Sequence, residues 1–343
     1  MIVEPLADSF DPVQAAAYEE LMNAWVPSTP PPAPHLDAEI PECVETVYVL
    51  SRVTLGADIK ITSAIFDAMK KRFHSADIVF VANRKSAELF ASDSRISHFE
   101  AEYPRAQPVS HRIEFAHELQ RRLEGPNRIV IDPDSRMTQL GLVPVCEAHN
   151  YFHFPSRTAN GEDNLTQLAQ RWLEKTFGES AQAYLAPNRV PIDGEAPRAT
   201  ISFGVGENDS KRIGGEFEAQ VIRALGEKFQ TVWIDRGVGG EEARRVTTAA
   251  EVSGRADRIR FWEGSFAGFA SIVSQSDLYV GYDSAGQHAA AAAEVPLISI
   301  FAGAPSERFR QRWSPAGSGR IRVINADLLA PEDCLEKFCA LLE

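Results

Sequence analysis

Short apolar runs alternate with amphipathic stretches along most of the chain, from residue 44 to its end. β-Branched and apolar runs predict strands at 47–53, 77–82, 96–99 and 128–131, and then at 199–203, 231–234, 258–261, 278–280, 297–301 and 321–324. Apolar residues at helical spacing predict helices at 59–72, 84–92, 113–123 and 164–177, and then at 216–228, 241–252, 266–276, 284–293 and 331–342. Strands that alternate with helices predict parallel sheets with helices on both faces.

A break in this alternation predicts the domain organisation. Residues 185–198 contain three prolines and one glycine without periodicity, as an interdomain linker does. We therefore expect an N-terminal domain at 44–184, a C-terminal domain at 199–325 and a closing helix within 326–343. The predicted fold class is α/β, with two Rossmann-like doubly wound domains facing a central cleft. A ligand is expected near the carboxyl ends of both sheets.

Residues 1–43 differ from the rest of the chain. The run Pro27–Pro34 favours an extended conformation and cannot join a helix or a central strand. Residues 13–25, before it, can form a short amphipathic helix. We expect this extension to be packed on the main body or tethered to it.

Composition narrows the classes of partner. The formal net charge of -13 argues against a nucleic-acid partner, but a local basic pocket for a small phosphorylated ligand remains compatible with it. The four cysteines form no C-x-x-C pair, so we expect neither a disulfide framework nor a structural zinc site. Scattered cysteines of this kind favour a reducing compartment. There is no apolar run of about 18 residues and no signal-peptide pattern, so we expect a cytoplasmic protein.

The most informative motif is the segment Asp283-Ser-Ala-Gly-Gln-His288, which follows a predicted strand and precedes an alanine-rich helix. Asp283 or Ser284 suits the N-cap position of that helix. The first turn would then present backbone N–H groups and the positive end of the helix dipole to an anion such as a phosphate, with His288 one turn further on. A capped turn with a packing histidine explains the same residues without a ligand.

This segment resembles the family nine glycosyltransferases, the bacterial heptosyltransferase family, whose pattern Asp-(Ser/Thr)-Gly-x-x-His holds the diphosphate of ADP-heptose. Asp283, Ser284 and His288 match the pattern, whereas Ala285 replaces its glycine and Gly286 follows. The downstream stretch from Phe301 to Arg308 is similar to another block of the family. The resemblance implies the GT-B fold, with the nucleotide-sugar site on the C-terminal domain.

Two further predictions for the donor site follow from the resemblance. The basic pair Lys211-Arg212, after a strand and a glycine-containing loop, is similar to a family segment whose lysine contacts the donor phosphates. A lysine is a mobile point charge suited to a diphosphate, although a solvated Lys-Arg pair is the commoner structure. Glu241, with its neighbour Glu242, takes the place of a family acidic residue near the nucleoside.

The candidate base is Asp58. In the family a strand leads into Gly-Asp, and that aspartate is the proposed base for the acceptor hydroxyl. Here Gly56 is followed by Ala57, and the aspartate comes one residue later. A strand-to-helix turn can absorb a shift of one residue, so Asp58 is the predicted base. The alternative is that Asp58 only caps the following helix.

Arg136 and Arg157 are the acceptor-side candidates, because each follows a predicted strand or loop of the N-terminal domain and can bind an acidic or phosphorylated acceptor. Most single arginines are surface residues, which is the alternative. His149 and His153 have the spacing of helical neighbours, but Pro155 and the aromatic residues around them favour a loop or a strand. We do not assign them as metal ligands.

The resemblance implies transfer of a sugar, with inversion, from a nucleotide donor to a hydroxyl of a glycan, glycolipid or small molecule. ADP-heptose is the expected donor substrate, and neither a cofactor nor a metal ion is expected. Work at the cytosolic face of the inner membrane is implied, with at most a peripheral contact. The alternatives are another donor with an acceptor other than lipopolysaccharide, a protein that binds nucleotide-sugars without transfer, and a scaffold whose extension recruits a partner.

Overall fold

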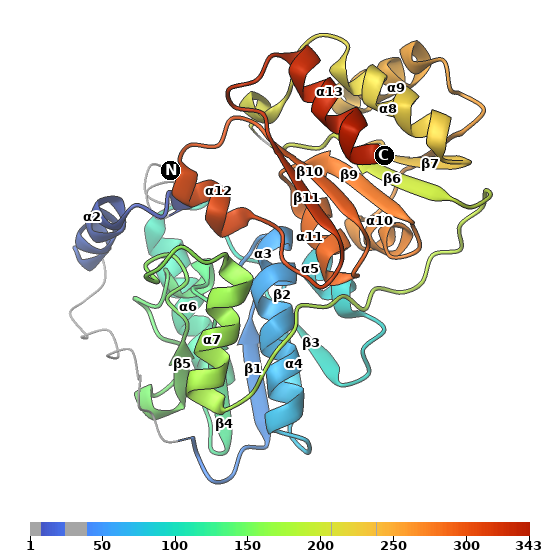
Figure 1. Cartoon of the computed structure of the whole chain (residues 1–343). Helices are drawn as coiled ribbons and strands as arrows, with labels where there is room; N and C mark the ends of the chain where they lie inside the picture. Colours follow the sequence, from blue (N-terminus) through green and yellow to red (C-terminus); the bar gives the residue numbers. More distant parts are fainter. Residues whose placement is uncertain (1–7, 25–39, 207, 238) are drawn as a thin grey trace. The chain divides into compact units, whose positions relative to one another are not determined.

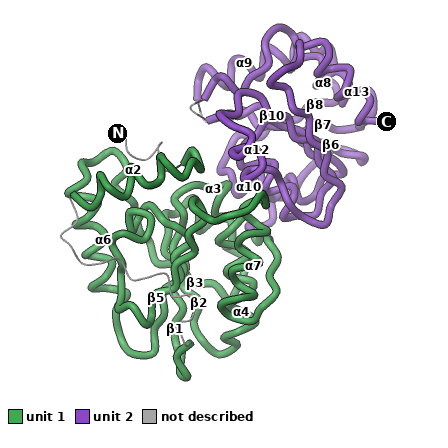
Figure 2. Tube along the Cα trace, turned by 60° about the vertical axis from the view of Figure 1, so that its left-hand side comes forward, with its two compact units in different colours: residues 1–186 green, residues 187–343 purple. Residues whose placement is uncertain are grey.

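The computed structural model describes residues 8–24, 40–206, 208–237 and 239–343. The chain divides into two compact units, Met1–Ala186 and Pro187–Glu343, coloured separately in Figure 2. The division therefore falls inside the predicted linker. No helix in the described ranges is long and apolar enough to cross a membrane.

Unit 1 is built on a parallel five-stranded sheet. Its strands are β1 (Thr46–Leu50), β2 (Asp77–Ala82), β3 (Ile96–Glu100), β4 (Arg128–Asp132) and β5 (Tyr151–His153), in the order β3-β2-β1-β4-β5. Its helices are α2 (Pro12–Asn23), α3 (Leu55–Ala57), α4 (Ser63–Arg72), α5 (Arg84–Ala87), α6 (Val109–Leu123) and α7 (Leu165–Phe177). A π-helical turn, η1 (Asp58–Thr62), joins α3 to α4, so one continuous helical segment follows β1.

Both faces of this sheet are covered, as Figure 1 shows. On one face, Leu50 and Val130 pack in a cluster with Ile113, Ala116 and other residues of α6. On the other face, α4 packs against α7. The buried Phe66 of α4 meets Phe80 of β2 edge to face, with ring centroids 5.0 Å apart. Alternating residues of each strand thus face opposite helical layers. Because both faces are buried, the sequences of the strands are nearly continuous apolar runs.

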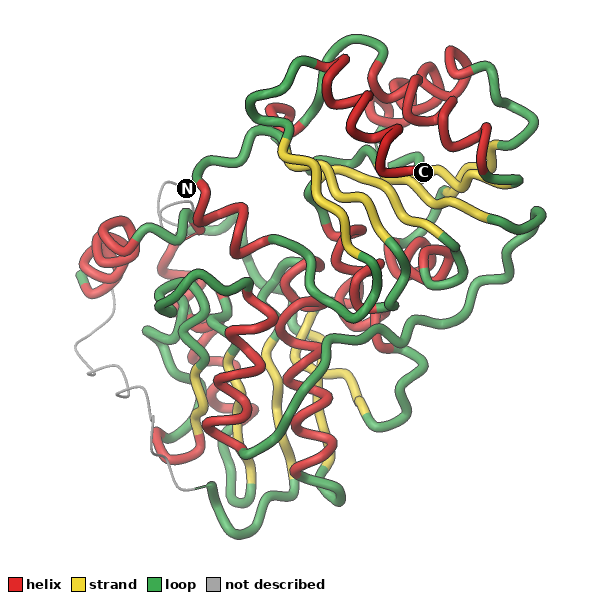
Figure 3. The backbone as a smooth tube through the Cα atoms, viewed as in Figure 1, coloured by secondary structure: helices red, strands yellow, loops and turns green. Residues whose placement is uncertain are grey.

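Unit 2 has a parallel six-stranded sheet. Its strands are β6 (Arg198–Ser202), β7 (Thr231–Asp235), β8 (Ile259–Trp262), β9 (Leu278–Tyr282), β10 (Leu297–Phe301) and β11 (Ile321–Asn325), in the order β11-β10-β9-β6-β7-β8. Its helices are α8 (Phe217–Lys228), α9 (Gly240–Ser253), α10 (Phe266–Val273), α11 (Ala285–Ala292), α12 (Glu307–Trp313) and α13 (Pro331–Leu342). One hydrophobic cluster joins the sheet to α8, α9 and α13, and another joins it to α10 and α11. Figure 3 shows these two helical layers on either side of the strands.

Each sheet reverses its winding direction at one point. In unit 1 the order changes direction between β1 and β4, and in unit 2 between β6 and β9. Loops at the carboxyl ends of the two strands at such a switch point diverge to opposite faces of the sheet and leave a crevice for ligands. The loops after β1, β4, β6 and β9 are therefore where each unit is expected to carry its site.

The predicted α/β class with two Rossmann-like doubly wound domains is confirmed. Three of the labelled elements were not predicted: α3, which precedes the predicted helix at 59–72, β5, which has only three residues, and α12, whose sequence is mostly charged. The predicted helix at 84–92 is a short α-turn followed by a 3-10 turn. In the extension, the predicted short helix is α2, whereas the run Pro27–Pro34 lies outside the described residues.

The extension packs on unit 1 through α2. Tyr18 and Met22 of this helix are buried against Val109, Leu140 and Leu142. Asp11 caps the helix by accepting from the backbone N–H of Val13 at 2.8 Å.

Candidate functional site

Two loops meet at the switch point of unit 2. Lys211 lies in the loop after β6, and its ammonium group is 2.7 Å from Oδ2 of Asp283, which directly follows β9. The same ammonium donates to the backbone carbonyl of Asp283 at 3.1 Å. The aspartate is buried and the lysine is partly buried. The structure thus brings together two residues that are far apart in the sequence and that were both predicted for the donor site.

The helix that follows Asp283 starts without a side-chain cap. Ser284 occupies the N-cap position of α11 in extended conformation but makes no capping hydrogen bond to the N–H groups of the first turn. Gly286 packs so closely on buried Tyr279 that a Cβ atom at this position would lie 2.1 Å from the tyrosine oxygen. The glycine therefore sets how tightly the helix start approaches β9. An uncapped helix start presents N–H donors and a positive dipole end to an anion.

Behind this helix start is a buried polar network. Gln287 donates to Oδ1 of Asp283 at 2.5 Å, and Ser299 of β10 donates to Oε1 of Gln287. His288 is 3% exposed, and its ring centroid lies 5.8 Å from that of Trp313 in α12. The network orients the Asp283 carboxylate toward Lys211. It also places His288 within one turn of the helix start, as predicted.

Acidic groups lie at the neighbouring strand ends of unit 2. Asp235, the last residue of β7, accepts from the Ser202 hydroxyl at 3.1 Å, and burial raises its pKa. Glu242 lies against Gly204 and Gly237, in the loops after β6 and β7, and burial raises the pKa of this carboxyl too. Glu241, the predicted residue, is exposed on the first turn of α9. Glu242 is thus the glutamate that packs at the switch-point side of the sheet.

These residues can hold a polyanion such as a diphosphate. Lys211 supplies a mobile cation, and the start of α11 supplies backbone donors about one residue from Asp283. Carboxyl groups whose pKa is raised by burial can pair with hydroxyl groups of a bound nucleoside. In doubly wound α/β domains the crevice at the switch point is where ligands bind.

Asp58 is fully buried in unit 1. Its carboxylate accepts from the Ser51 hydroxyl at 2.7 Å, the Arg52 backbone N–H at 2.8 Å and the Thr62 hydroxyl at 2.9 Å. Burial, the largest effect, raises its pKa against these hydrogen bonds. The alternative that Asp58 caps a helix is wrong, because the N-cap of the helical segment is Thr54. Asp58 instead ties this segment to the loop after β1.

That loop carries Arg52, which joins the two predicted acceptor-side arginines. Arg52 follows β1, Arg136 lies in the loop after β4 and Arg157 lies in the loop after β5. The Ser135 hydroxyl donates to the Ser51 carbonyl at 2.6 Å and holds the first two loops together. All three arginine side chains are at least nine-tenths buried. The switch point of unit 1 therefore gathers three buried arginines.

Asp134 is the central carboxylate of this arginine cluster, which we define as Arg52, Arg136 and Arg157. It is 3.2 Å from the Arg157 guanidinium and 3.9 Å from that of Arg52, and His153 of β5 lies 3.6 Å away. Burial acts to raise the pKa of Asp134, but the charge of Arg157 and the other cations hold it well below its usual value. The same carboxylate raises the pKa of His153 against the effect of burial.

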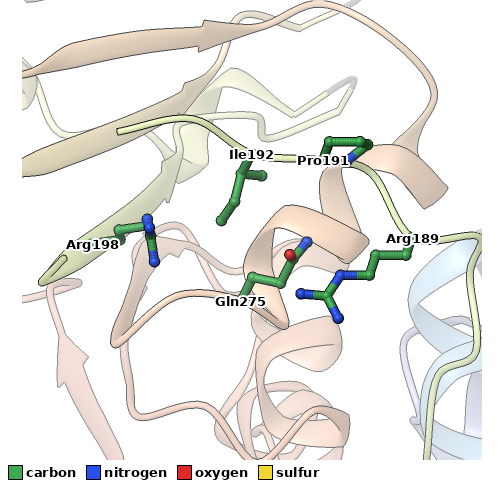
Figure 4. A pocket seen from close by; sticks show the side chains of 5 residues that line it. All are labelled: Arg189, Pro191, Ile192, Arg198 and Gln275. Carbon is green, nitrogen blue, oxygen red and sulfur yellow. The ribbon is translucent and has the colours of Figure 1, made fainter. Parts of the chain in front are cut away.

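The described residues also line two cavities in unit 2. One, of about 610 Å³, is lined by Arg189, Arg198, Gln275 and two apolar neighbours (Figure 4). Because Arg198 begins β6 and Gln275 precedes β9, this cavity lies at the amino ends of the strands, away from Lys211 and Asp283. The other, of about 500 Å³, lies between α8 and α9 and includes Arg212 and Glu218.

The comparisons with solved structures identify proteins of the same fold. A family 9 glycosyl transferase from Veillonella parvula superposes with a TM-score of 0.62 at 14% identity, covering 82% of this chain and 85% of its own. E. coli heptosyltransferase WaaC, solved with ADP-2-deoxy-2-fluoro heptose, gives 0.64 at 15% identity, covering 87% of this chain and 100% of its own. E. coli ADP-heptose lps heptosyltransferase II gives 0.60 at 16% identity, with 87% and 98% covered.

These likenesses confirm the predicted resemblance at the level of the fold, which is that of the GT-B glycosyltransferases. No family model matches the sequence, and no curated protein matches it either.

The structure therefore groups the predicted residues into two sites. Lys211, Asp283, Ser284, Gly286 and His288 gather at the switch point of unit 2, and Arg136 and Arg157 gather at that of unit 1. Sequence reasoning missed Arg52, and it preferred Glu241 to its neighbour Glu242. The position of Arg52 directly after a buried strand was a signal for it. For Asp8, which contacts the arginine cluster, the sequence holds no such signal.

Proposed function

We propose that this protein is a glycosyltransferase that binds a nucleoside-diphosphate sugar, ADP-heptose, on unit 2 and transfers the sugar to a hydroxyl acceptor with inversion. The observation that carries the proposal is the pairing of Lys211 with Asp283 beside the uncapped start of α11. The fold shared with the E. coli heptosyltransferase solved with an ADP-heptose analogue supports the choice of donor.

On this proposal the donor diphosphate lies across the start of α11. Its oxygens accept from the Lys211 ammonium and from backbone N–H groups of the first helical turn, with Ser284 and His288 beside them. These donors are in place before the sugar leaves, so they stabilise the negative charge that develops on the diphosphate. The Asp283 carboxylate orients the lysine. This charge stabilisation is assigned to the chain itself, without a metal ion, and a chelator is expected to leave turnover unchanged.

The transfer step forms one bond and breaks another at the anomeric carbon. The acceptor oxygen attacks from the face opposite the diphosphate, the bond to the diphosphate oxygen breaks with its electron pair, and the acceptor proton passes to a base. Asp58 is the proposed base, because its pKa is raised by burial and a raised pKa suits proton transfer near neutral pH. Glu242 and Asp235 are the groups proposed to accept from the nucleoside hydroxyls.

The donor site is tested by calorimetric titration with ADP, with UDP and GDP as controls. We expect selective binding of ADP. Loss of Lys211 in K211A should weaken it roughly ten- to a hundred-fold, the range of one charge-assisted hydrogen bond. Lys337 is exposed on α13 of the same unit, so K337A is the matched control and should bind as the parent does. Selective binding of UDP or GDP would change the assigned donor to a UDP-sugar or a GDP-sugar. If none of the three nucleotides binds, the proposal is overturned.

A second function, binding of nucleotide-sugars without transfer, is favoured by one observation. Both oxygens of Asp58 are engaged by Ser51, Arg52 and Thr62, and the side chain is fully buried. On this second function the carboxylate only positions the loop after β1. The two functions share the donor site and differ in whether any acceptor is glycosylated.

Variants of Asp58 and its partner separate these functions. If Asp58 is the base, D58N should abolish transfer while ADP affinity is kept, and the pH profile of transfer should lose its acidic limb. S51A, which removes one hydrogen bond to the same carboxylate, is the matched control and should keep most of the activity. If D58N and S51A lower transfer equally and in step with their loss of thermal stability, Asp58 has only a positioning role.

A further inference from the structure

The N-terminal extension places a carboxylate directly on the arginine cluster of unit 1. Oδ1 of Asp8 accepts from Nε of Arg157 at 2.9 Å, and its Oδ2 pairs with the Arg136 guanidinium. One carboxylate is thus shared between two arginines that come from different loops of the sheet. The segment that supplies it lies more than a hundred residues earlier in the chain.

The two arginines are more buried than the Asp8 carboxylate that pairs with them. This difference indicates that Asp8 occupies an anion-binding site formed by the arginines. The side chains of Arg136 and Arg157 are 8% and 5% exposed, whereas that of Asp8 is 35% exposed. The arginines therefore form the floor, and the position taken by the Asp8 carboxylate is open to solvent on its outer side. A soluble anion can reach this position without rearrangement of the sheet.

Arg52 adds an independent observation. Its guanidinium is 2% exposed, and within the described ranges its Nε and Nη2 atoms have no hydrogen-bond partner. Burial and the charge of Arg157 lower the pKa of Arg52 to about 9. Buried N–H groups without acceptors are costly, and an anion with more oxygens than a single carboxylate can accept from them.

Charge balance makes the same point. Three guanidinium groups face the carboxylates of Asp8 and Asp134. Burial acts to raise the pKa of Asp8, but Arg157, Arg136 and Arg52 lower it to about 2, so it is ionised at neutral pH. Without Asp8, three buried cations would face the single carboxylate of Asp134. Another anion in its place would supply the lost negative charge.

The segment that carries Asp8 is anchored by Phe10, whose side chain is fully buried. Phe10, two residues on, has a φ of 59°, a left-handed backbone conformation that a bulky residue rarely adopts. The following helix, α2, buries only Ala15, Tyr18 and Met22, while Val13 and Leu21 of the same helix are exposed. The side chain of Asp8, by contrast, is 35% exposed. It can turn away from the arginines while Phe10 stays buried, so displacement of Asp8 is compatible with an intact unit 1.

We propose that the arginine cluster is a binding site for the carboxylate or phosphate group of an external ligand, and that Asp8 is an internal occupant which this ligand displaces. Binding of the anion stands by itself. The further role of the site, which is to hold an anionic group of the acceptor, rests on the proposed function. The extension would then limit access to the acceptor site until an anionic ligand competes for it.

The test is the affinity of the full-length protein for inorganic phosphate and for malonate, measured by calorimetry at constant ionic strength. If Asp8 occupies the site nine-tenths of the time, D8A should bind the probe at least about ten-fold more tightly than the parent. Glu20 is exposed on α2 of the same segment, so E20A is the matched control and should bind as the parent does. D8A/R157Q should lose the gain, which localises it to the cluster.

The two probes distinguish the sources of the anion. A gain for phosphate alone indicates a phosphate monoester, a gain for malonate alone indicates a carboxylate, and either result supports the site. Equal affinity of the parent and D8A for both probes would overturn the proposal, as would a gain that persists in D8A/R157Q.

If D8A does not fold, D8N keeps the shape of the side chain, and thermal unfolding replaces calorimetry. Phosphate should then raise the midpoint more in D8N than in the parent. A midpoint raised equally in both would contradict the proposal. No donor or transfer is needed in any of these measurements, so the result is independent of whether the protein proves to be a glycosyltransferase.

Discussion

Substitution of Gly286 by alanine is the sharpest test of how the start of α11 is positioned. A Cβ atom at this residue would lie 2.1 Å from Oη and 2.7 Å from Cζ of Tyr279, far below the distance that such contacts allow. The tyrosine belongs to β9 and is fully buried. Its oxygen is also only 2.4 Å from the position of a Cβ at Gly281, so the ring has no free side toward which to move.

The overlap must therefore be relieved by movement of the helix start away from β9. Overpacking of this kind costs about 1–3 kcal/mol. For a domain of this size, each kcal/mol lowers the unfolding midpoint by about 2–4 °C, so we expect a fall of roughly 4–8 °C for 2 kcal/mol. Movement of the first turn also misaligns its N–H donors, and ADP affinity should fall roughly ten-fold or more.

Thermal unfolding and ADP titration of G286A measure both effects. Gly240, at the start of α9, has nothing within 4 Å of its added Cβ, so G240A is the matched control and should leave the midpoint nearly unchanged. The double variant G286A/Y279F removes the nearest clash and leaves the one at Cζ. It should recover part of the lost stability. The free-energy change of the double variant should therefore differ from the sum of the two single changes by at least about 0.5 kcal/mol. Strictly additive effects, or a G286A midpoint equal to that of the parent, would refute the reasoning.

Three other predictions follow from the packing and charges. F66A removes a buried ring that lies 5.0 Å from the rings of both Phe80 and Phe90, and should cost about 3–5 kcal/mol in the denaturant-derived stability of unit 1; a loss below about 1 kcal/mol would contradict this packing. Burial raises the pKa of Glu218 from its usual value of 4.5 to about 7. The folded state therefore binds the proton more tightly, and stability should fall by roughly 3 kcal/mol at most as pH rises from about 4.5 to above 7. The thermal midpoint of E218Q should vary less with pH than that of the parent, and parallel profiles would exclude the effect. N164A removes a capping box at α7 and should cost about 1 kcal/mol by thermal unfolding, whereas a neutral substitution would show that the box contributes nothing.

Several features of the fold follow from local patterns in the sequence. The strands at 77–82 and 297–301 and the helix at 331–342 have the predicted bounds, because each combines a strong apolar pattern with a proline, a charge or a turn at its ends. Elements that lack a strong apolar pattern were not predicted. β5 has three residues, too few for a period of two to emerge, and α12 is mostly charged.

The part of the candidate donor site that one continuous segment of the chain forms could be predicted from the sequence. The segment from Asp283 to His288 carries its own strand-to-helix turn, so the position of its helix start could be inferred from the sequence. The choice between Glu241 and Glu242 could not be inferred from the sequence. Neighbouring residues on a helix point about 100° apart, and only the packing of α9 decides which of the two faces the loops.

The sequence by itself thus determined two doubly wound units, a linker between them and the strand-to-helix turn at Asp283–His288, because periodicity, turn chemistry and short motifs act over a few residues. Only the tertiary structure decided which distant residues meet. The parallel order of the strands sets the loop of Lys211 against Asp283. It also gathers Arg52, Arg136 and Arg157 at one switch point and buries Asp58 behind them. The contact of Asp8 with that cluster depends on the folding of a segment at the far end of the chain. Such pairings depend on chain topology and on the desolvation of charges, neither of which local sequence patterns report.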